Sequence, residues 1–139
     1  MAEVFTHRFR VRYAEVDPQS VVFNSRYLEY ADIIITEYWR SLGIHFTGTD
    51  ALEFHVARAE IDFVKPLRAD EWVIGKGWTE RVGTSSVVTR IELHGESGDD
   101  LRSSITLVHV HVDLETGQAI PVTGDVRALM LGEQEPVNG

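Results

Sequence analysis

The chain has 139 residues, no cysteine and a formal net charge of −9. A chain of this length accommodates one domain, and it can bury roughly 68% of its unfolded surface without disulfides or a metal. The absence of cysteine excludes disulfides, thiolate metal sites and a cysteine nucleophile. The excess of 22 acidic over 13 basic residues argues against a nucleic-acid partner, since phosphate neutralisation needs a basic face.

No apolar run of the sequence approaches the roughly 20 residues that a membrane span needs. The first residues also lack the basic and then apolar regions of a signal peptide. We therefore expect a cytoplasmic protein with no membrane partner.

The first expected element is a strand at His7–Tyr13. Its aromatic and apolar side chains alternate with three arginines, which places Tyr13 on the apolar face. The segment 14–24 contains Pro18 and Ser20 and breaks this alternation, so we expect a loop there.

A helix is expected at Ser25–Leu42, where apolar side chains recur at helical spacing. Asn24 or Ser25 can cap its start, and Gly43 can supply the left-handed residue that follows its end. Three consecutive isoleucines widen the apolar stripe of this helix. It therefore needs cover on more than one side, which a curved sheet would provide.

The rest of the chain predicts a series of strands. Four are expected, at Glu53–Val64, Glu71–Arg81, Ser85–His94 and Arg102–Leu114. The turns between them are short and favour antiparallel pairing of successive strands. Val122–Leu131 predicts either a short helix or a final strand, and residues 132–139 predict a flexible polar tail.

The last long strand carries two alternating sets of side chains. We expect the apolar set to face the helix, namely Val108, Val110, Val112 and Leu114. The other set is expected to point away from it, namely His109, His111 and Asp113. Together these elements predict an α+β fold in one domain over residues 1–131, with one long helix packed in an antiparallel sheet of about five or six strands.

The segment that joins the first strand to the helix carries the chemistry. Asp17 lies just ahead of the helix N-terminus, where free backbone N–H groups carry a partial positive charge. Pro18 holds the backbone of Asp17 away from the helical region. A carboxylate and an N–H group placed together can attack and polarise a carbonyl. The alternative is that Asp17 only forms a turn or a cap.

This segment follows a family pattern, Tyr-x-Glu-x-Asp and then Val-aromatic-(His or Asn)-x-x-Tyr. The matching residues are Tyr13, Glu15, Asp17, Val22, Phe23, Asn24, Tyr27 and Leu28. Further matches lie at 36–38, at 42–43, at 58–63 with Pro66, and at Gly83 followed by Ser85 and Ser86. Over residues 5–131 the chain resembles the hotdog-fold acyl-CoA thioesterases of the 4-hydroxybenzoyl-CoA thioesterase type.

The resemblance implies a hotdog fold that hydrolyses an acyl-CoA thioester to the free acid and coenzyme A, with no separate cofactor. It also implies a homodimer with the active site at the protomer interface, and often a homotetramer built as a dimer of dimers. By position, Asp17 matches the catalytic carboxylate of the family, and the backbone N–H of Asn24 matches the donor to the thioester carbonyl. Tyr27 matches a position beside that donor, with packing as the alternative role.

Two positions depart from the family pattern. Ser20 stands where the family has a loop glycine, which affects how closely the backbone can approach a ligand. Asp32 stands where relatives often carry glutamate on the helix, so the acid is kept with a shorter reach.

A polyanionic ligand on an acidic chain needs a local positive patch. The expected members of this patch are Arg58, Lys65, Arg81 and Arg90, each with a solvated surface charge as the alternative. Gly83 and Ser85 resemble the family's turn near the pantetheine arm, and a plain hairpin turn is the alternative. Four apolar residues can line the acyl site, with core packing as the alternative for each: Phe23, Phe54, Val56 and Trp39. The acyl group can be aryl or a short to medium aliphatic chain.

Other functions receive less support from the sequence. A metal site at His109 and His111, with His94 or Asp113, is disfavoured because their spacing is ordinary for a strand face, so we expect no metal. A Gly-x-Ser-x-Gly nucleophile motif is absent. A hotdog dehydratase would need a site histidine, and none occurs in residues 8–44. The alternative from another class is a non-catalytic domain that binds or senses acyl-CoA.

Overall fold

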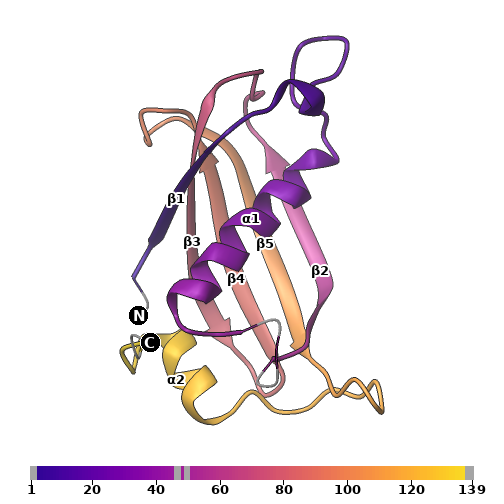
Figure 1. Cartoon of the computed structure of the whole chain (residues 1–139), viewed down its shortest axis with the longest axis vertical. Coiled ribbons are helices and arrows are strands. Elements are labelled where there is room, and N and C mark those ends of the chain that lie inside the picture. The colour runs from indigo at the N-terminus through magenta and orange to yellow at the C-terminus, as the bar shows by residue number, and fades with distance from the viewer. Residues whose placement is uncertain (1–2, 46–47, 49–50, 137–139) are drawn as a thin grey trace.

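The computed structural model of the chain describes residues 3–45, 48 and 51–136. Its elements are β1 (Phe5–Arg10), a 3₁₀ turn (Tyr13–Glu15), α1 (Arg26–Ser41), β2 (Phe54–Phe63), β3 (Trp72–Val82), β4 (Ser86–His94), β5 (Leu101–His111) and α2 (Gly124–Leu131). The five strands form one antiparallel sheet in the order β1-β3-β4-β5-β2, and α1 lies across one face of it (Figure 1). The expected two-layer α+β arrangement is confirmed.

The position of β2 in the sheet differs from the expectation. The prediction that successive strands pair is correct for β3 with β4 and for β4 with β5. It is wrong for β2, which pairs with β5 at the far edge, while β1 occupies the place beside β3. The segment 64–71 is therefore not a hairpin turn. It crosses one end of the sheet from the β2 edge to β3 (Figure 1).

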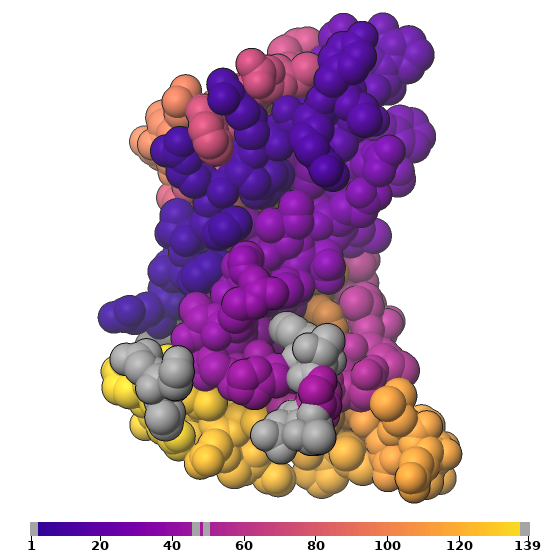
Figure 2. All heavy atoms as spheres, in the orientation of Figure 1, coloured from indigo at the N-terminus to yellow at the C-terminus, as the bar shows by residue number. Residues whose placement is uncertain are grey.

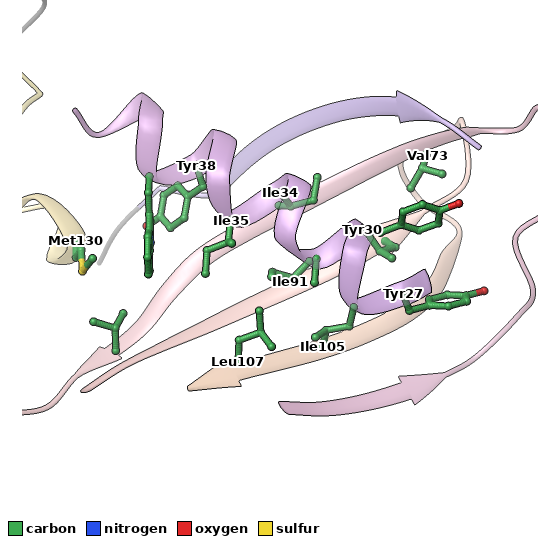
Figure 3. Packing of buried hydrophobic residues seen from close by; sticks show 14 of the residues in the cluster. Tyr27, Tyr30, Ile34, Ile35, Tyr38, Val73, Ile91, Ile105, Leu107 and Met130 are labelled. Carbon is green, nitrogen blue, oxygen red and sulfur yellow. The ribbon is translucent and has the colours of Figure 1, made fainter. Parts of the chain in front are cut away.

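The core lies between α1 and the concave face of the sheet (Figure 3). Ile34, which is fully buried, sits at the centre of the helix and lies directly over Gly75 of β3. A methyl group at Gly75 would overlap the end of the Ile34 side chain. Glycine at this position thus lets the helix and the sheet approach each other closely.

The expected facing of β5 is wrong. Ile105, Leu107 and His109 are buried and pair with core residues of β4, so this set faces α1. Val108 and Val110 lie on the other face of the sheet and are half-buried. Both faces of this strand carry apolar side chains, and pairing with Val87 and Ile91 of β4 places His109 and Ile105 on the side of α1.

Three smaller differences concern the ends of elements. β1 ends at Arg10, and Tyr13 begins a 3₁₀ turn with its side chain 87% exposed rather than on the apolar face. Ser25 occupies the N-cap position of α1, but its side chain makes no capping hydrogen bond. Gly43 follows the helix with a φ of +82°, as predicted.

The C-terminal segment forms the helix α2 rather than a strand. Its Met130 is buried, and its Arg127 donates hydrogen bonds to the carbonyl oxygens of Val82 and Gly83, at 3.1 Å and 2.9 Å. Of the expected tail, residues 137–139 lie outside the described residues. Neither α-helix in the described ranges is long and apolar enough to span a membrane.

Candidate active site

The loop that carries Asp17 is closed by backbone hydrogen bonds. Val16 and Val22 form an isolated antiparallel bridge at its base. Beyond the bridge, the Asp17 N–H donates to the Val21 carbonyl at 2.8 Å, and the Ser20 N–H donates to the Asp17 carbonyl at 2.8 Å. Asp17 is therefore held at one side of a tight loop whose other side leads directly into α1.

Two details of this loop bear on its chemistry. Ser20 has a φ of +66°, a left-handed conformation that glycine adopts most easily, at the position where the resembling family has a glycine. One carboxylate oxygen of Asp17, Oδ1, accepts a hydrogen bond from the Gln19 N–H at 2.8 Å. The other oxygen, Oδ2, accepts no hydrogen bond from the described residues. The half-buried carboxylate is thus oriented by its own turn and keeps a free oxygen.

Glu15 anchors the base of the loop. Its buried carboxylate accepts hydrogen bonds from the Arg12 N–H at 2.8 Å, from the Arg12 guanidinium, and from the Tyr30 hydroxyl at 2.9 Å. Burial alone would raise the pKa of Glu15, but these hydrogen bonds outweigh it and the pKa is lowered. The Glu15 carbonyl also accepts from the Phe23 N–H at 3.1 Å. An ionised, fully bonded carboxylate thereby ties the loop to α1.

The N-terminus of α1 presents a free donor beside this loop. The Arg26 N–H donates to the Phe23 carbonyl at 2.9 Å, whereas the backbone N–H of Asn24 donates to no acceptor in the described part of the chain. Asn24 and Phe23 are both exposed. A free N–H at a helix N-terminus is suited to bind an oxygen that carries negative charge.

A shallow cavity of about 290 Å³ adjoins this helix end. It is lined by Val22, Asn24, Tyr27, Phe63, Val64, Lys65 and Pro66. Tyr27 is buried in its wall, with its ring edge-on to Phe63 at 5.0 Å between centroids. The Leu67 N–H donates to the Tyr27 hydroxyl at 3.3 Å, and burial raises the pKa of this phenol. The hydroxyl of Tyr27 therefore positions the segment that follows β2.

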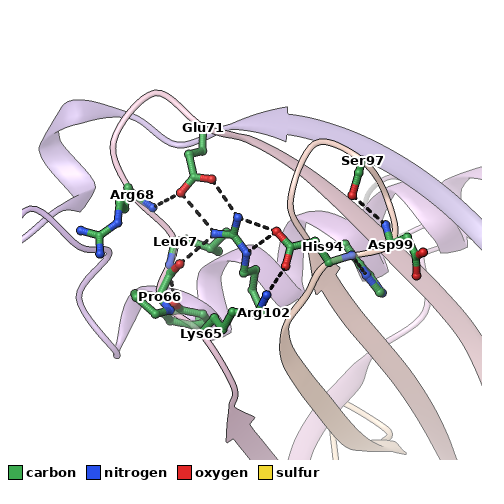
Figure 4. Close-up of polar contacts among 11 residues, drawn as sticks. Lys65, Pro66, Leu67, Arg68, Glu71, His94, Ser97, Asp99 and Arg102 are labelled. Atoms are coloured by element: carbon green, nitrogen blue, oxygen red, sulfur yellow. Dashed lines mark hydrogen bonds and ion pairs between the residues drawn. The ribbon is translucent and has the colours of Figure 1, made fainter.

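A polar cluster holds the same segment from the other side (Figure 4). Arg102 of β5 donates to both carboxylate oxygens of Glu71, to Asp100 and to the Pro66 carbonyl, the last at 2.8 Å. Lys65 pairs with Asp100 at 2.6 Å. These bonds raise the pKa of Arg102 and lower that of Asp100 to about 2. The cluster fixes the chain segment that forms one wall of the cavity.

The structure brings some of the predicted site residues together and separates the others. Five lie at one end of the protomer, around the loop and the start of α1: Asp17, Phe23, Asn24, Tyr27 and Lys65. Three lie at the opposite end of β3 and β4: Arg81, Gly83 and Ser85. An eleven-residue strand spans about 35 Å, so these two groups do not meet within one protomer.

The remaining predicted cations are engaged elsewhere. Arg58 lies exposed on β2 and pairs with Glu60. Arg90 lies half-buried on the face of the sheet away from α1, 3.7 Å from Glu80. The expected positive patch is therefore not assembled in a single protomer.

Two arginines at this end were not identified from the sequence as candidate site residues. Arg102 organises the cavity wall through partners that are distant in sequence, and no local pattern marks it. Arg68 is joined to Val21 by a backbone bridge, which places it beside the Asp17 loop. Its guanidinium binds none of the described residues and points away from the cluster of Arg102 (Figure 4). The only sequence signal for Arg68 was its place between two expected strands.

The histidines do not form a metal site. His94 lies at one end of the β4–β5 ladder and His109 at the other. Across the residues that the structure describes, three or more potential ligands nowhere come together in a geometry that could hold a metal ion.

Comparison with known proteins gives the family. The model of the thioesterase superfamily matches residues 19–101, more than half of the chain. A protein of Bacillus subtilis (strain 168), YneP, named as a candidate acyl-CoA thioesterase, is 26% identical over 112 residues, covering 79% of this chain and 80% of its own length.

Solved structures show the same fold. The 1,4-dihydroxy-2-naphthoyl-CoA thioesterase Slr0204 from Synechocystis superposes with a TM-score of 0.84 at 15% identity, covering 93% of this chain and 96% of that chain. A thioesterase from Thermus thermophilus, solved with coenzyme A and zinc, gives a TM-score of 0.79 at 22% identity, covering 90% and 95%. The two-layer arrangement described above is thus the hotdog thioesterase fold. From the family match, the chain belongs to the thioesterase superfamily and is a thioester hydrolase.

Proposed function

We propose that the protein hydrolyses an acyl-CoA thioester to the free acid and coenzyme A, as a 4-hydroxybenzoyl-CoA thioesterase-like enzyme. The observation that carries the proposal is the placement of Asp17. Its oriented carboxylate keeps one oxygen free of the described residues, and it lies on the loop that leads into α1, at whose N-terminus the N–H of Asn24 has no acceptor among the described residues. The substrate is an aryl or a short to medium acyl-CoA.

The chemistry of the leaving group explains why one carboxylate suffices. A thiol with a pKa of about 8.5 leaves readily as the thiolate, so no strong general acid is required. The Asn24 N–H stabilises the oxyanion, a role that is worth roughly 3–4 kcal/mol in other hydrolases. Asp17 either attacks the thioester carbon, expelling the thiolate and leaving a mixed anhydride for water to cleave, or takes a proton from the water that attacks. Both routes consume one water and yield acid and thiol.

A homodimer through the free edge of β2 is the second part of the proposal. β2 is ten residues long and pairs on one side only, and Val56, Phe63 and Val64 are more than half exposed along it and after its end. A long edge strand with exposed apolar side chains favours pairing with another strand. The shorter edge strand β1 has six residues.

Antiparallel pairing of two β2 strands about a twofold axis would also reunite the separated site residues. It brings the Phe63 end of one β2 beside the Phe54 end of the other β2. Arg81 and Gly83 lie at the Phe54 end of the sheet, so they would approach the Asp17 loop of the other protomer. The outward face of the sheet, with half-buried Trp72 and Trp78, offers a surface for the association of two such dimers. For the polyanionic nucleotide, Lys65 and Arg68 supply local positive charge on an acidic protein.

The decisive experiment compares Asp17→Asn with Asp70→Asn in an acyl-CoA hydrolysis assay that detects the released thiol. Asp70 is also an exposed loop carboxylate, on the neighbouring turn, and pairs with Arg10. We expect Asp17→Asn to lower kcat at least about 100-fold and Asp70→Asn to leave it nearly unchanged. Near-wild-type turnover by Asp17→Asn would refute the assignment. Tight binding of acyl-CoA without thiol release by the wild-type protein would favour a sensing domain instead.

A further inference from the structure

A second cavity lies between the C-terminal half of α1 and β2, away from the Asp17 loop. Its volume is about 470 Å³. It is lined by Asp32, Ile35, Thr36, Trp39, Arg40, Ile44, His45, Phe54, Val56 and His109. Figure 2 shows atoms of β5 between α1 and β2. The walls are apolar and aromatic, while the charged side chains stand at the exposed rim.

His109 of β5 is the buried polar group in this cavity. Only 6% of the residue is exposed, and its ring meets that of Trp39 edge-on at 5.0 Å between centroids. The Nδ1 atom is buried, and neither ring nitrogen forms a hydrogen bond with the described part of the chain. Buried polar groups are nearly always hydrogen-bonded in native proteins. An imidazole without a partner, in the wall of a cavity, therefore points to a ligand that supplies one.

The cavity is too distant from the Asn24 N–H of its own protomer to hold a short acyl group bound there. Asn24 lies just ahead of α1, and the lining residues of α1, from Asp32 to Arg40, follow it by roughly 12–24 Å along the helix axis. In the proposed dimer, however, the Phe54 end of one β2 lies beside the Phe63 end of the other. The cavity of one protomer would then adjoin the Asp17 loop of its partner.

We propose that this cavity receives the acyl group of the substrate and that His109 selects acyl groups carrying a hydroxyl on an otherwise apolar body. The proposal rests on the proposed thioesterase function and extends it to a specificity-determining residue.

The protonation state of His109 determines which polar group of a ligand can form hydrogen bonds with its imidazole. Burial lowers the pKa of His109 to about 4, so the imidazole is neutral at pH 7. A neutral imidazole offers one N–H donor and one acceptor nitrogen. A hydroxyl complements both, because it donates and accepts. A carboxylate does not, since it would be buried without a countercharge on the cavity floor.

The test compares three thioesters of equal chain length: hexanoyl-CoA, 6-hydroxyhexanoyl-CoA and 5-carboxypentanoyl-CoA, together with the corresponding eight-carbon set. For the wild-type protein we expect kcat/KM to be about tenfold higher for the hydroxy compound than for the plain acyl-CoA in at least one set, and lowest for the carboxy compound. His109→Leu should remove the preference for the hydroxyl, and His109→Gln should retain part of it.

The matched control is His111→Leu, which removes an imidazole from the same strand and outside the cavity lining. It should leave the preference intact. Thermal melting confirms that each variant folds. The proposal is overturned if the wild-type protein does not distinguish hydroxy from plain acyl groups in either set, or if His109→Leu keeps the wild-type ratio. If no thioester of any kind is hydrolysed, the proposed function fails first.

Discussion

Arg102 donates hydrogen bonds at 3.2 Å and 3.0 Å to the two carboxylate oxygens of Glu71, although 31 residues separate the pair in sequence. The same guanidinium holds the Pro66 carbonyl at 2.8 Å. Its side chain is only 13% exposed. The pair thus fastens the crossover segment 64–71, one wall of the candidate active site, to the central sheet.

Replacing Arg102 should weaken both the fold and the site. Arg102→Gln leaves the Glu71 carboxylate and the Pro66 carbonyl without their donor, and we expect the free energy of unfolding to fall by about 2 kcal/mol, less than for a fully buried pair because Glu71 is partly exposed. Urea denaturation measures the loss. Arg58→Gln, which breaks an exposed pair with Glu60, should cost less than about 0.5 kcal/mol. Equal losses for the two variants would contradict this role of Arg102.

Stability should fall in mild acid because of His109. The folded protein keeps this imidazole neutral down to a pKa of about 4, whereas the unfolded chain takes up a proton below about 6.5. Stability is therefore lost as the pH falls from 6.5 towards 4, by about 2 kcal/mol at pH 5. His109→Leu should remove this loss, which denaturation at pH 7 and pH 5 would show. The same pH dependence in the variant and the wild-type protein would exclude this cause.

The conformation of Ser20 predicts a stabilising substitution. A φ of +66° costs a non-glycine residue roughly 1–2 kcal/mol, a cost that glycine avoids. Glycine also loses more conformational freedom on folding, and this loss offsets part of the gain. Ser20→Gly should therefore raise the free energy of unfolding by up to about 1 kcal/mol and leave kcat within about twofold. Ser25→Gly, at a position with a φ of −68°, should instead lower stability. Thermal and urea unfolding of both variants would check the contrast.

Mixed dimers would show whether one acyl site is built from two protomers. An Asp17→Asn protomer paired with a His109→Leu protomer contains one doubly altered site and one site with both residues intact, if the two residues meet across the interface. The heterodimer, purified with two affinity tags, should then hydrolyse the hydroxyacyl-CoA with wild-type selectivity at about half the wild-type rate. If both residues belonged to one protomer's site, only the unselective activity of the His109→Leu site would remain.

The parts of the fold that follow local patterns were predictable from the sequence. The helical spacing gave α1 within one residue at each end, and alternation with short turns gave β3 and β4. These local patterns could not predict the position of β2 in the sheet, because the segment 64–71 contains no signal that shows whether β2 pairs with β3 or with β5. The facing of β5 was ambiguous for another reason. Both of its faces are apolar, and only pairing with Val87 and Ile91 of β4 decides the phase.

The same distinction between local patterns and contacts distant in sequence applies to the candidate site. Asp17 and Asn24 belong to one short segment, so their neighbourhood could be read from spacing. The cluster of Arg102 and the cavity around His109 depend on contacts between strands distant in sequence, and they became visible only in three dimensions. The sequence around Arg81 and Gly83 gives no indication that these residues lie at the opposite end of β3 from the Asp17 loop.

The strand order also bears on the sequence of events in folding. β3, β4 and β5 pair with their neighbours in the chain, whereas the edge strands β1 and β2 must find partners that are far away in sequence. Such non-local pairings form slowly and open readily. The Asp17 loop follows β1 and the crossover segment follows β2, so both segments are attached to these late-forming edge strands. The end of the protein that carries Asp17 should therefore be the last part to assemble, and the first to be lost when the structure loosens.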